Sequence, residues 1–397
     1  MIFGLLFLGL QTFLAFFRPK YFVFTYLLYI SSFLGFFTKN IVIGGVEIGL
    51  FYHSILMLGN YFMFYKQRKD LPKYINGLLT GTLLLFLYGI FYPVATGFSS
   101  VTQSIIASKE FSTIFFMHYL FIYHKKFDFK YLSKVLSFLG YYFLLILLVY
   151  SVFKIVPPQY IKKLGAFEYY FPTILSLFLY FKMAQANTFS KKVIAFLFLI
   201  IWAVGMYYEG HTAITITTIL GCLIILFRIP VIRFLKDYKT IILGLTFFGL
   251  LFLFLPTDKY IKEFQQNPNI QSRNIVNAQR MEFIMEQPWQ GYGFLHRSAL
   301  EFESQNRYAL DLSYIDSGYI DLLGKFGIVG IVIYLIMLSL PLLLKTSNIM
   351  GLSLKVFLIQ LFLVNITWSV FSFSVGLISL SVGYILLFYI KIEDNNY

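Results

Sequence analysis

Long apolar stretches alternate with short polar ones along almost the whole chain of 397 residues. Most stretches are about 17–25 residues long, which is the length that a helix needs to cross the hydrocarbon layer of a membrane. Within them the apolar residues are continuous and do not alternate with polar ones, so the pattern predicts helices and not the strands of a barrel. Thirteen spans are expected, at about 2–17, 21–37, 42–65, 74–97, 104–123, 131–153, 169–185, 193–209, 211–227, 240–256, 317–344, 352–371 and 375–390.

The first stretch has no basic residue before it and no small-residue cleavage site, so we expect a retained span and not a signal peptide. The pattern shows no internal repeat and no soluble domain at either end. The predicted fold is therefore all-α: one integral membrane domain over residues 1–397, a polytopic bundle of about 12–14 spans. One long and partly helical loop, residues 257–316, is expected between two of the spans.

Composition agrees with this class of protein. Apolar residues make up 59% of the chain, aromatic residues 21% and charged residues 13%, and the mean hydropathy is +0.75, whereas a soluble protein carries about 25% charged residues. The single cysteine, Cys222, excludes an intrachain disulfide and argues against a cysteine-ligated metal. No two histidines have metal-ligand spacing and no hydrolase nucleophile motif is present. We therefore expect neither a metal nor a cofactor.

Basic residues predict the orientation of the chain. They gather in alternate short loops, at Lys66–Lys73, Lys125–Lys130, Lys191–Lys192 and Arg228–Lys239. Because short cytoplasmic loops are enriched in Lys and Arg, these loops and the C-terminal tail are predicted to be cytoplasmic. The segment 257–316 is then external, or periplasmic. The net charge of +14 reflects this topology and attraction to anionic membrane lipid, and it is too dispersed to indicate nucleic-acid binding.

The segment 257–316 is unusual in its charges. It holds eight of the 18 acidic residues and four of the chain's eight arginines, whereas most other cations in the chain are lysines. Arginine keeps its charge and presents a planar fork of donors that suits phosphate. A loop of this length is usually functional. The four arginines are Arg273, Arg280, Arg297 and Arg307.

A helix is predicted over residues 272–286, ended by Pro288. Arg273, Asn277 and Arg280 have the spacing i, i+4, i+7, so they share one face of that helix. A cation near a helix start is disfavoured by the dipole unless an anion binds there as well. The three residues are therefore candidate ligands of a phosphate-bearing substrate.

A plainer interpretation stays open for the same arginines: they pair with Glu282, Glu286 or lipid phosphates. The following Gly291-Tyr292-Gly293 has no strand before it and no Lys-Ser/Thr after it, so it is not a nucleotide-binding loop. We expect a tight turn that brings the backbone close to another segment. Gly327 and Gly330 in the next span would allow close helix contact.

The end of the loop offers further candidates. Asp316 precedes the span at 317–344 and is either its N-cap or a functional carboxylate at the mouth of a span. Tyr319 is a candidate substrate-binding residue one turn further on. Asp321 and Lys325 have i, i+4 spacing and are expected to pair.

A last pair of candidates lies at a predicted external junction between two spans. Glu209 and His211 could handle a proton or a lipid headgroup there, and the alternative is a tight turn with an interfacial histidine.

The stretches "RNIVNAQRMEFIMEQPWQGYGF" and "SGYIDLLGKFGIVG", in that order around a long external loop, resemble the O-antigen polymerase and ligase superfamily. The resemblance covers about 205–344 by motif, and Arg273 falls at the family's arginine. Two positions depart from the ligase pattern: His211 stands where ligases have an arginine, and Asp316 where they have a histidine. Both departures favour the polymerase branch.

The resemblance implies a GT-C-like integral membrane glycosyltransferase in the bacterial inner membrane, working at the periplasmic face in surface polysaccharide or lipopolysaccharide biosynthesis. Its donor would be a glycan on undecaprenyl pyrophosphate, and its acceptor a second lipid-linked repeat unit. The transfer would invert the linkage and would use no nucleotide sugar and no metal. A chain-length regulator protein is a candidate partner.

The family chemistry assigns expected roles. Arg273 and Arg280, with Asn277, would stabilise the leaving pyrophosphate, and Asp316 would take the proton of the acceptor hydroxyl. His211 is the second candidate base or a phosphate ligand, and Glu209 and Tyr319 are further substrate-binding candidates.

Three alternatives remain from sequence. The first is a ligase or protein oligosaccharyltransferase of the same superfamily, and the second is a non-catalytic membrane partner in polysaccharide assembly. The third is a flippase, which would use charges within spans, here Glu47 and Glu110.

Overall fold

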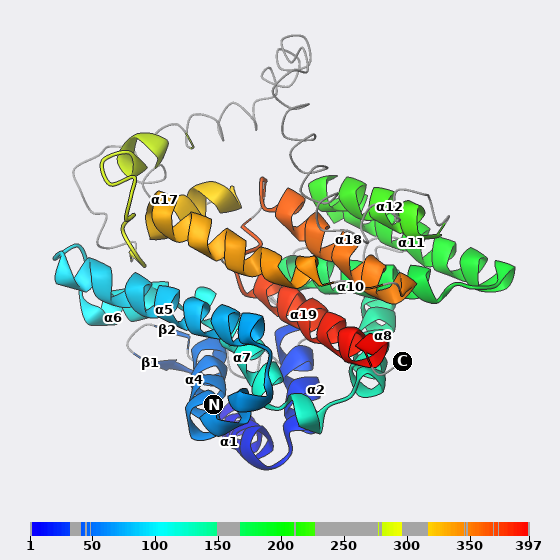
Figure 1. Ribbon diagram of the computed structural model, residues 1–397, viewed down its shortest axis with the longest axis horizontal. Helices are drawn as coiled ribbons and strands as arrows, with labels where there is room; N and C mark the ends of the chain where they lie inside the picture. Colours follow the sequence, from blue (N-terminus) through cyan, green and yellow to red (C-terminus); the bar gives the residue numbers. More distant parts are fainter. Residues whose placement is uncertain are drawn as a thin grey trace, which may run out of the picture.

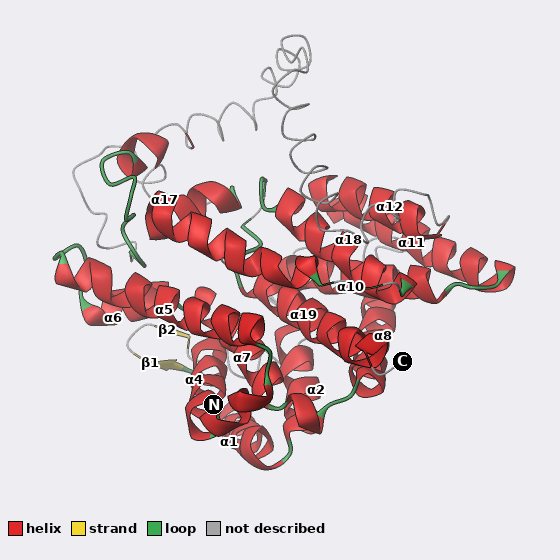
Figure 2. Cartoon of the chain, viewed as in Figure 1, coloured by secondary structure: helices red, strands yellow, loops and turns green. Residues whose placement is uncertain are grey.

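The computed structural model describes residues 2–31, 41–43, 46–47, 49–148, 167–209, 212–226, 277, 280–295, 317–344, 346, 348–367, 369–371 and 373–395. Over these residues the chain is a bundle of helices with one small hairpin (Figures 1 and 2), which confirms the predicted all-α class. Four of the described helices are long and apolar enough to cross a membrane, or five if a bent pair counts as one span. The fold is that of a multi-pass membrane protein.

Every predicted span except the one at about 240–256 coincides with a described helix or helix pair; that span lies outside the described residues. The α-helices are α1 (Ile2–Phe17), α2 (Pro19–Ser31), α4 (Gly49–Met63), α5 (Lys73–Ala95), α6 (Val101–Ala107), α7 (Phe115–Ile122), α8 (Phe129–Leu147), α10 (Phe167–Gln185), α11 (Phe189–Glu209), α12 (Thr212–Leu226), α17 (Gly318–Ser339), α18 (Ile349–Val364) and α19 (Ser374–Asn395). Single 3-10 turns are η2 (Tyr65–Asp70), η3 (Phe111–Ile114), η4 (His124–Lys126) and η7 (Leu340–Leu343).

The helices pack in three groups that share one apolar core. Helix α10 contacts α8, α11, α12, α18 and α19; α4 contacts α1 and α7; and α5 contacts α6 and α17. Helix α19 joins the groups, because it contacts both α10 and α7, and Figure 1 shows it between them. Large side chains that are fully buried, such as Trp202, Tyr180 and Tyr384, fill this core.

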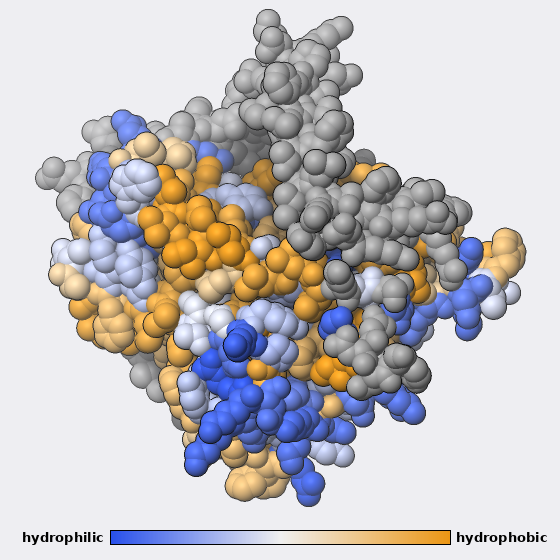
Figure 3. All heavy atoms as spheres, in the orientation of Figure 1, coloured by the Kyte–Doolittle hydropathy of each residue, from blue (hydrophilic) through white to orange (hydrophobic). Residues whose placement is uncertain are grey.

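Two of the connections predicted to be cytoplasmic, η2 and η4, lie close to each other and to the C-terminal end of α19. Lys125 of η4 pairs with Asp70 of η2, N–O 2.5 Å, and the Lys125 ammonium lowers the pKa of the exposed Asp70 carboxyl. Near the C-terminal end of α19, Tyr389 donates to the His124 carbonyl at 2.5 Å. This end is hydrophilic in Figure 3, below a broad hydrophobic band. These two connections therefore lie on the same side of the bundle, as the alternation of the basic loops predicts.

Two predicted spans differ from the structure. The span expected from 42 begins at Gly49, because β1 (Val42–Ile43) and β2 (Val46–Glu47) form a short antiparallel hairpin before it, with Val42 opposite Glu47. The span expected at 104–123 is not one helix: α6 and the segment η3–α7 meet at an angle of 62°. Serine and threonine stabilise this bend, since Ser112 Oγ donates to the Lys109 carbonyl at 2.6 Å and Thr113 Oγ1 to the Glu110 carbonyl at 2.8 Å.

Helix α17 is interrupted at Gly327, which has φ +64° and ψ −175°. A continuous helix would bond Ile328 N–H to the Gly324 carbonyl and Val329 N–H to the Lys325 carbonyl. Both bonds are replaced by contacts with residues 288–294, which we call the wedge. The replacing bonds are Ile328 N to Pro288 O (2.8 Å), Val329 N to Trp289 O (3.3 Å), Tyr292 N to Gly324 O (2.8 Å) and Gly293 N to Lys325 O (2.8 Å).

The wedge also compensates for a proline in α5. Pro93 lies inside that helix and has no N–H to donate to the Gly89 carbonyl four residues earlier. The Phe294 N–H donates to that carbonyl instead, at 2.6 Å. The ring of Phe294 is fully buried, 5.9 Å from the ring of Phe86 and 5.8 Å from that of Phe326. The end of the predicted external loop therefore enters the bundle between α5 and α17.

Close approach of the wedge requires glycine. Gly291 and Gly293 both have positive φ, +67° and +71°. A Cβ on Gly291 would lie 2.5 Å from the Gly327 nitrogen, and a Cβ on Gly327 would lie 2.3 Å from the Trp289 carbonyl oxygen. The tight turn expected at Gly291–Gly293 is confirmed. The close contact expected at Gly327 was with a helix, whereas the segment that approaches this glycine is the wedge.

We predict that Gly291→Ala lowers the free energy of unfolding more than Gly97→Ala does. Gly97 has a similar φ of +78° but nothing within 4 Å of an added Cβ, so alanine there costs only the backbone strain of about 1–2 kcal/mol. At Gly291 the same strain is joined by a clash with the backbone of α17. Thermal or SDS-induced unfolding in detergent measures the difference, and equal losses in the two variants would contradict the docked geometry.

Candidate functional site

The wedge closes one side of a small cavity between α17, the bend before α7 and the start of α19. Its volume is about 30 Å³. Residues 293–295 line it together with Ala107, Gly324 and two sets of side chains. The charged set is Glu110, Asp321 and Lys325, and the aromatic set is Phe111, Phe294 and Phe373. Three charged groups thus meet where two helices lose their continuity.

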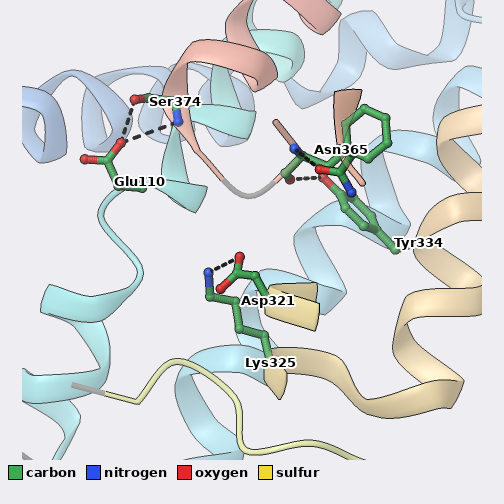
Figure 4. A network of polar contacts seen from close by, with 7 residues as sticks. Glu110, Asp321, Lys325, Tyr334, Asn365 and Ser374 are labelled. Carbon is green, nitrogen blue, oxygen red and sulfur yellow. Dashed lines mark hydrogen bonds and ion pairs between the residues drawn. The ribbon is translucent and has the colours of Figure 1, made fainter. Parts of the chain in front are cut away.

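Asp321 and Lys325 form a buried ion pair across one turn of α17 (Figure 4). Lys325 Nζ donates to Asp321 Oδ2 at 2.7 Å, and the side chains are 14% and 0% exposed. The second carboxylate oxygen, Asp321 Oδ1, is buried without a hydrogen-bond partner among the described residues. The Lys325 ammonium also lies 5.8 Å from the centre of the Phe373 ring. The pairing predicted from the i, i+4 spacing is confirmed.

Glu110 reaches from the bend to the start of α19 (Figure 4). Its Oε2 accepts from Ser374 Oγ at 2.5 Å and from Ser374 N at 3.4 Å. Ser374 is the first residue of α19, so the carboxylate sits at a helix N-terminus, where the helix dipole favours negative charge. This contact holds the α6–α7 bend against α19.

The connection between α18 and α19 is fixed by α17. The Gly318 N–H donates to the Asn365 carbonyl at 2.9 Å, and Asn365 Oδ1 accepts from the Phe371 N–H at 3.1 Å. Tyr334, further along α17, donates to the Phe371 carbonyl at 2.9 Å (Figure 4). These bonds set the position of Phe373 and therefore one wall of the cavity.

The Arg280-bearing helix ends directly before the wedge. Residues 280–284 are helical and the following residues turn, which agrees with the helix end predicted before Pro288. Tyr292 ties this end to the wedge: its ring stacks on Phe283 at 4.3 Å, and its hydroxyl donates to the Phe283 carbonyl at 3.0 Å. Burial and the neighbouring Glu286 carboxylate raise the pKa of the Tyr292 hydroxyl, which stays a donor.

Arg280 is 6% exposed and Asn277 is half-buried, whereas Met285 is 59% exposed. The face that carries Arg280 and Asn277 therefore turns toward the protein. Arg280 is not among the residues that line the cavity. Arg273, the residue matched by motif, lies outside the described residues.

Of the other predicted site residues, Tyr319 donates its hydroxyl to the Phe362 carbonyl of α18 at 2.8 Å and does not line the cavity. Glu209 is the last residue of α11, and α12 begins at Thr212, so the predicted junction between two helices is confirmed. The side chain of Glu209 and all of His211 lie outside the described residues.

The N-cap of α17 is Ser317, one residue after Asp316, for which the sequence left open a cap or a functional carboxylate. Helix ends follow local backbone geometry, which a sequence pattern places only to within one or two residues. Asp316 itself lies outside the described residues.

Sequence reasoning predicted the Asp321–Lys325 pair but not its cavity, and it weighed Glu110 only as a sign of a flippase. The available signal for Glu110 was an ionisable residue inside the predicted span 104–123, which is a functional-site hypothesis by default. What could not be foreseen is its partner, because Ser374 lies 264 positions away along the chain. Among the residues that the structure describes, no group of three His, Cys, Asp or Glu side chains could hold a metal ion.

A family model described as O-antigen ligase matches residues 193–335, a segment that includes Arg273, Arg280, the wedge and most of α17. No curated protein matches the chain. The match supports a membrane enzyme of the O-antigen ligase and polymerase type, and it agrees with the resemblance carried by the sequence motifs.

We predict that breaking the buried Asp321–Lys325 pair lowers the free energy of unfolding more than breaking the exposed Asp70–Lys125 pair does. Lys325→Met leaves the Asp321 carboxylate buried without its cation and should lower the free energy of unfolding by about 3–5 kcal/mol. The double variant Asp321→Asn/Lys325→Met should lose clearly less free energy of unfolding than Lys325→Met. Lys125→Met, which breaks the exposed pair with Asp70, should lower the free energy of unfolding far less than Lys325→Met does, because solvent screens the exposed charges. Unfolding of the purified variants in detergent tests this, and strictly additive losses at Asp321 and Lys325 would contradict a coupled pair.

Proposed function

We propose that the protein is a membrane glycosyltransferase that polymerises oligosaccharide repeat units carried on undecaprenyl pyrophosphate. The growing chain would leave its pyrophosphate carrier and join the next lipid-linked unit at the periplasmic face of the inner membrane. The observation that carries this proposal is the family match over 193–335, the segment in which a loop rich in arginine is docked into a broken span. Departures from the ligase pattern at His211 and Asp316 favour the polymerase.

The proposed reaction is one inverting displacement. The acceptor hydroxyl oxygen bonds to the anomeric carbon of the donor glycan, and the bond between that carbon and the phosphate oxygen breaks. Its electron pair leaves with the lipid pyrophosphate, and the hydroxyl proton passes to a base. Developing negative charge on the phosphate is stabilised by Arg273 and Arg280, since preorganised cations at a forming anion act most strongly away from water.

Asp316 is the first candidate for the base and His211 the second, or a phosphate ligand. Asn277 and Glu209 remain candidate ligands of the substrate. The case for Tyr319 is weaker, since its hydroxyl is already bonded to α18.

A ligase is the second candidate function, because the matching family model is described by that activity. It would use the same donor and differ in the acceptor, which would be a lipid A core or a protein. The two functions therefore separate only by what accepts the glycan.

We predict that purified protein, incubated with one synthetic lipid-linked repeat unit and nothing else, forms a ladder of longer lipid-linked products on a gel. A product that requires an added lipid A core or protein would identify a ligase instead. Movement of the unit across vesicle membranes without a new covalent bond would identify a flippase and overturn the proposal.

We predict that Arg273→Ala lowers the rate of ladder formation by about 10²–10³, the usual effect of removing one group that stabilises a developing anion, while the protein still inserts into the membrane. Arg280→Lys keeps the charge but loses the planar fork and should also slow turnover. The rate is measured with saturating repeat unit. Lys191→Ala, at a loop predicted to be cytoplasmic, is the matched control. Wild-type turnover in both arginine variants would remove the pyrophosphate assignment.

We predict that Asp316→Asn loses most ladder formation while the thermal stability of the protein is unchanged. Asparagine keeps the shape and hydrogen-bonding capacity of the side chain but cannot take a proton at neutral pH. Normal polymerisation by this variant would exclude Asp316 as the base and leave His211 as the candidate.

A further inference from the structure

The cavity between α17, the bend and α19 has one unexplained polar atom. Asp321 Oδ2 bonds to Lys325, and Glu110 Oε2 bonds to Ser374. Asp321 Oδ1 is fully buried and has no partner among the described residues. An acceptor left unsatisfied in this way costs about 1–3 kcal/mol, and more when it is charged. The cavity therefore offers a strong acceptor to any group that brings a donor.

The second polar feature of the cavity is the Lys325 ammonium. It carries three donors, and its one described hydrogen bond goes to Asp321. Its side chain is 14% exposed, so part of the residue is reached from the surface. A group that enters beside it meets a carboxylate acceptor and an ammonium donor only one helical turn apart.

The volume of the cavity and the charges that line it limit the class of ligand that can bind there. A volume of about 30 Å³ holds two or three groups of the size of water, because each needs about 10–15 Å³ measured in this way. A sugar ring does not fit, but a single hydroxyl arm does. A free cation is disfavoured by Lys325, and an anion by the carboxylates of Glu110 and Asp321. A hydroxyl group, which donates and accepts through one oxygen, suits both polar partners.

The aromatic wall adds a feature that suits sugars. Phe373 lies under the Lys325 ammonium and lines the cavity with Phe111 and Phe294. Aromatic faces pack against apolar surface while polar groups beside them fix orientation, which is the usual composition of a small-molecule site. A sugar that placed one hydroxyl in the cavity would find apolar surface for its C–H groups at the same wall.

We propose that this cavity is a subsite for one hydroxyl group of the acceptor sugar. The hydroxyl donates to Asp321 Oδ1 and accepts from Lys325 Nζ, and it is an anchoring hydroxyl and not the attacking one. The subsite rests on the proposed glycosyl transfer, and it assigns Asp321 and Lys325 to acceptor recognition. Water has the same hydrogen-bonding chemistry, so the test must separate a sugar hydroxyl from a trapped water.

The test uses a set of synthetic lipid-linked repeat units, each lacking one hydroxyl of its non-reducing terminal sugar, as acceptors for the purified protein. Removing the attacking hydroxyl abolishes transfer. Removing the anchoring hydroxyl should lower kcat/KM about ten- to a hundredfold, the effect of a hydrogen bond to a charged group. In Asp321→Asn the parent acceptor should already show this loss, and the anchoring deoxy acceptor should show no further one.

Two variants keep the result interpretable. Asp321→Asn/Lys325→Gln replaces the ion pair by two amides that can bond to each other, and it should show the same loss of discrimination if Asp321→Asn alone is unstable. Asp70→Asn changes the matched exposed pair with Lys125, 2.5 Å, and should keep the wild-type response to every deoxy acceptor. If all deoxy acceptors lose the same factor in Asp321→Asn as in wild type, the cavity holds water only and the subsite is wrong.

Equilibrium binding separates this proposal from the proposed function. The dissociation constants of the parent and deoxy units are measured for wild type and Asp321→Asn without following transfer. A weaker binding of one deoxy unit that disappears in Asp321→Asn supports the subsite even if no ladder forms, in which case only the polymerase proposal fails. A ladder without any such difference in binding or in kcat/KM overturns the subsite and leaves the polymerase proposal intact.

Discussion

One constraint governs the region around the candidate site: at membrane depth every backbone N–H and C=O needs a partner within the protein. Helix α17 loses two of its own hydrogen bonds at Gly327, and α5 loses one at Pro93. The wedge supplies all five missing partners through its own peptide groups. Because the contacts are made by backbone, what the sequence must provide is close approach, and the glycines at 291, 293 and 327 provide it.

The same docking determines where chemistry can occur. The wedge continues directly from the helix that carries Arg280, and Tyr292 holds the two together. Its far end, Gly293 and Phe294, lines the charged cavity together with Leu295. The stretch of chain that carries the proposed pyrophosphate ligands therefore continues to one wall of the proposed hydroxyl subsite, whose charged groups come from α17 and the bend. A long loop can take part in catalysis only if it is held in this way, since a misplacement of about 1 Å is costly in rate.

Much of the fold follows from sequence because apolar length is a strong signal for a membrane helix, and the described helices lie where the apolar runs predict them. The i, i+4 pair at Asp321 and Lys325, the end of the Arg280 helix and the turn at Gly291–Gly293 are local features, so they could be predicted as well. The bend at Glu110 and the interruption at Gly327 depend on partners far away in sequence, Ser374 and the wedge. When those partners are not known, the apolar sequence of each segment predicts one continuous span.

Charges inside a membrane protein are costly unless they are compensated. Each of the three charged groups at the cavity, Glu110, Asp321 and Lys325, therefore needs a compensating contact. The helix N-terminus of α19 and Ser374 account for Glu110, and Asp321 Oδ2 accounts for Lys325. These contacts are sufficient for a purely structural role. They do not account for Asp321 Oδ1, which is buried without a hydrogen-bond partner among the described residues. In the acceptor subsite that we propose, the donor to this oxygen is a hydroxyl group of the substrate, and Lys325 is held in place by the other carboxylate oxygen.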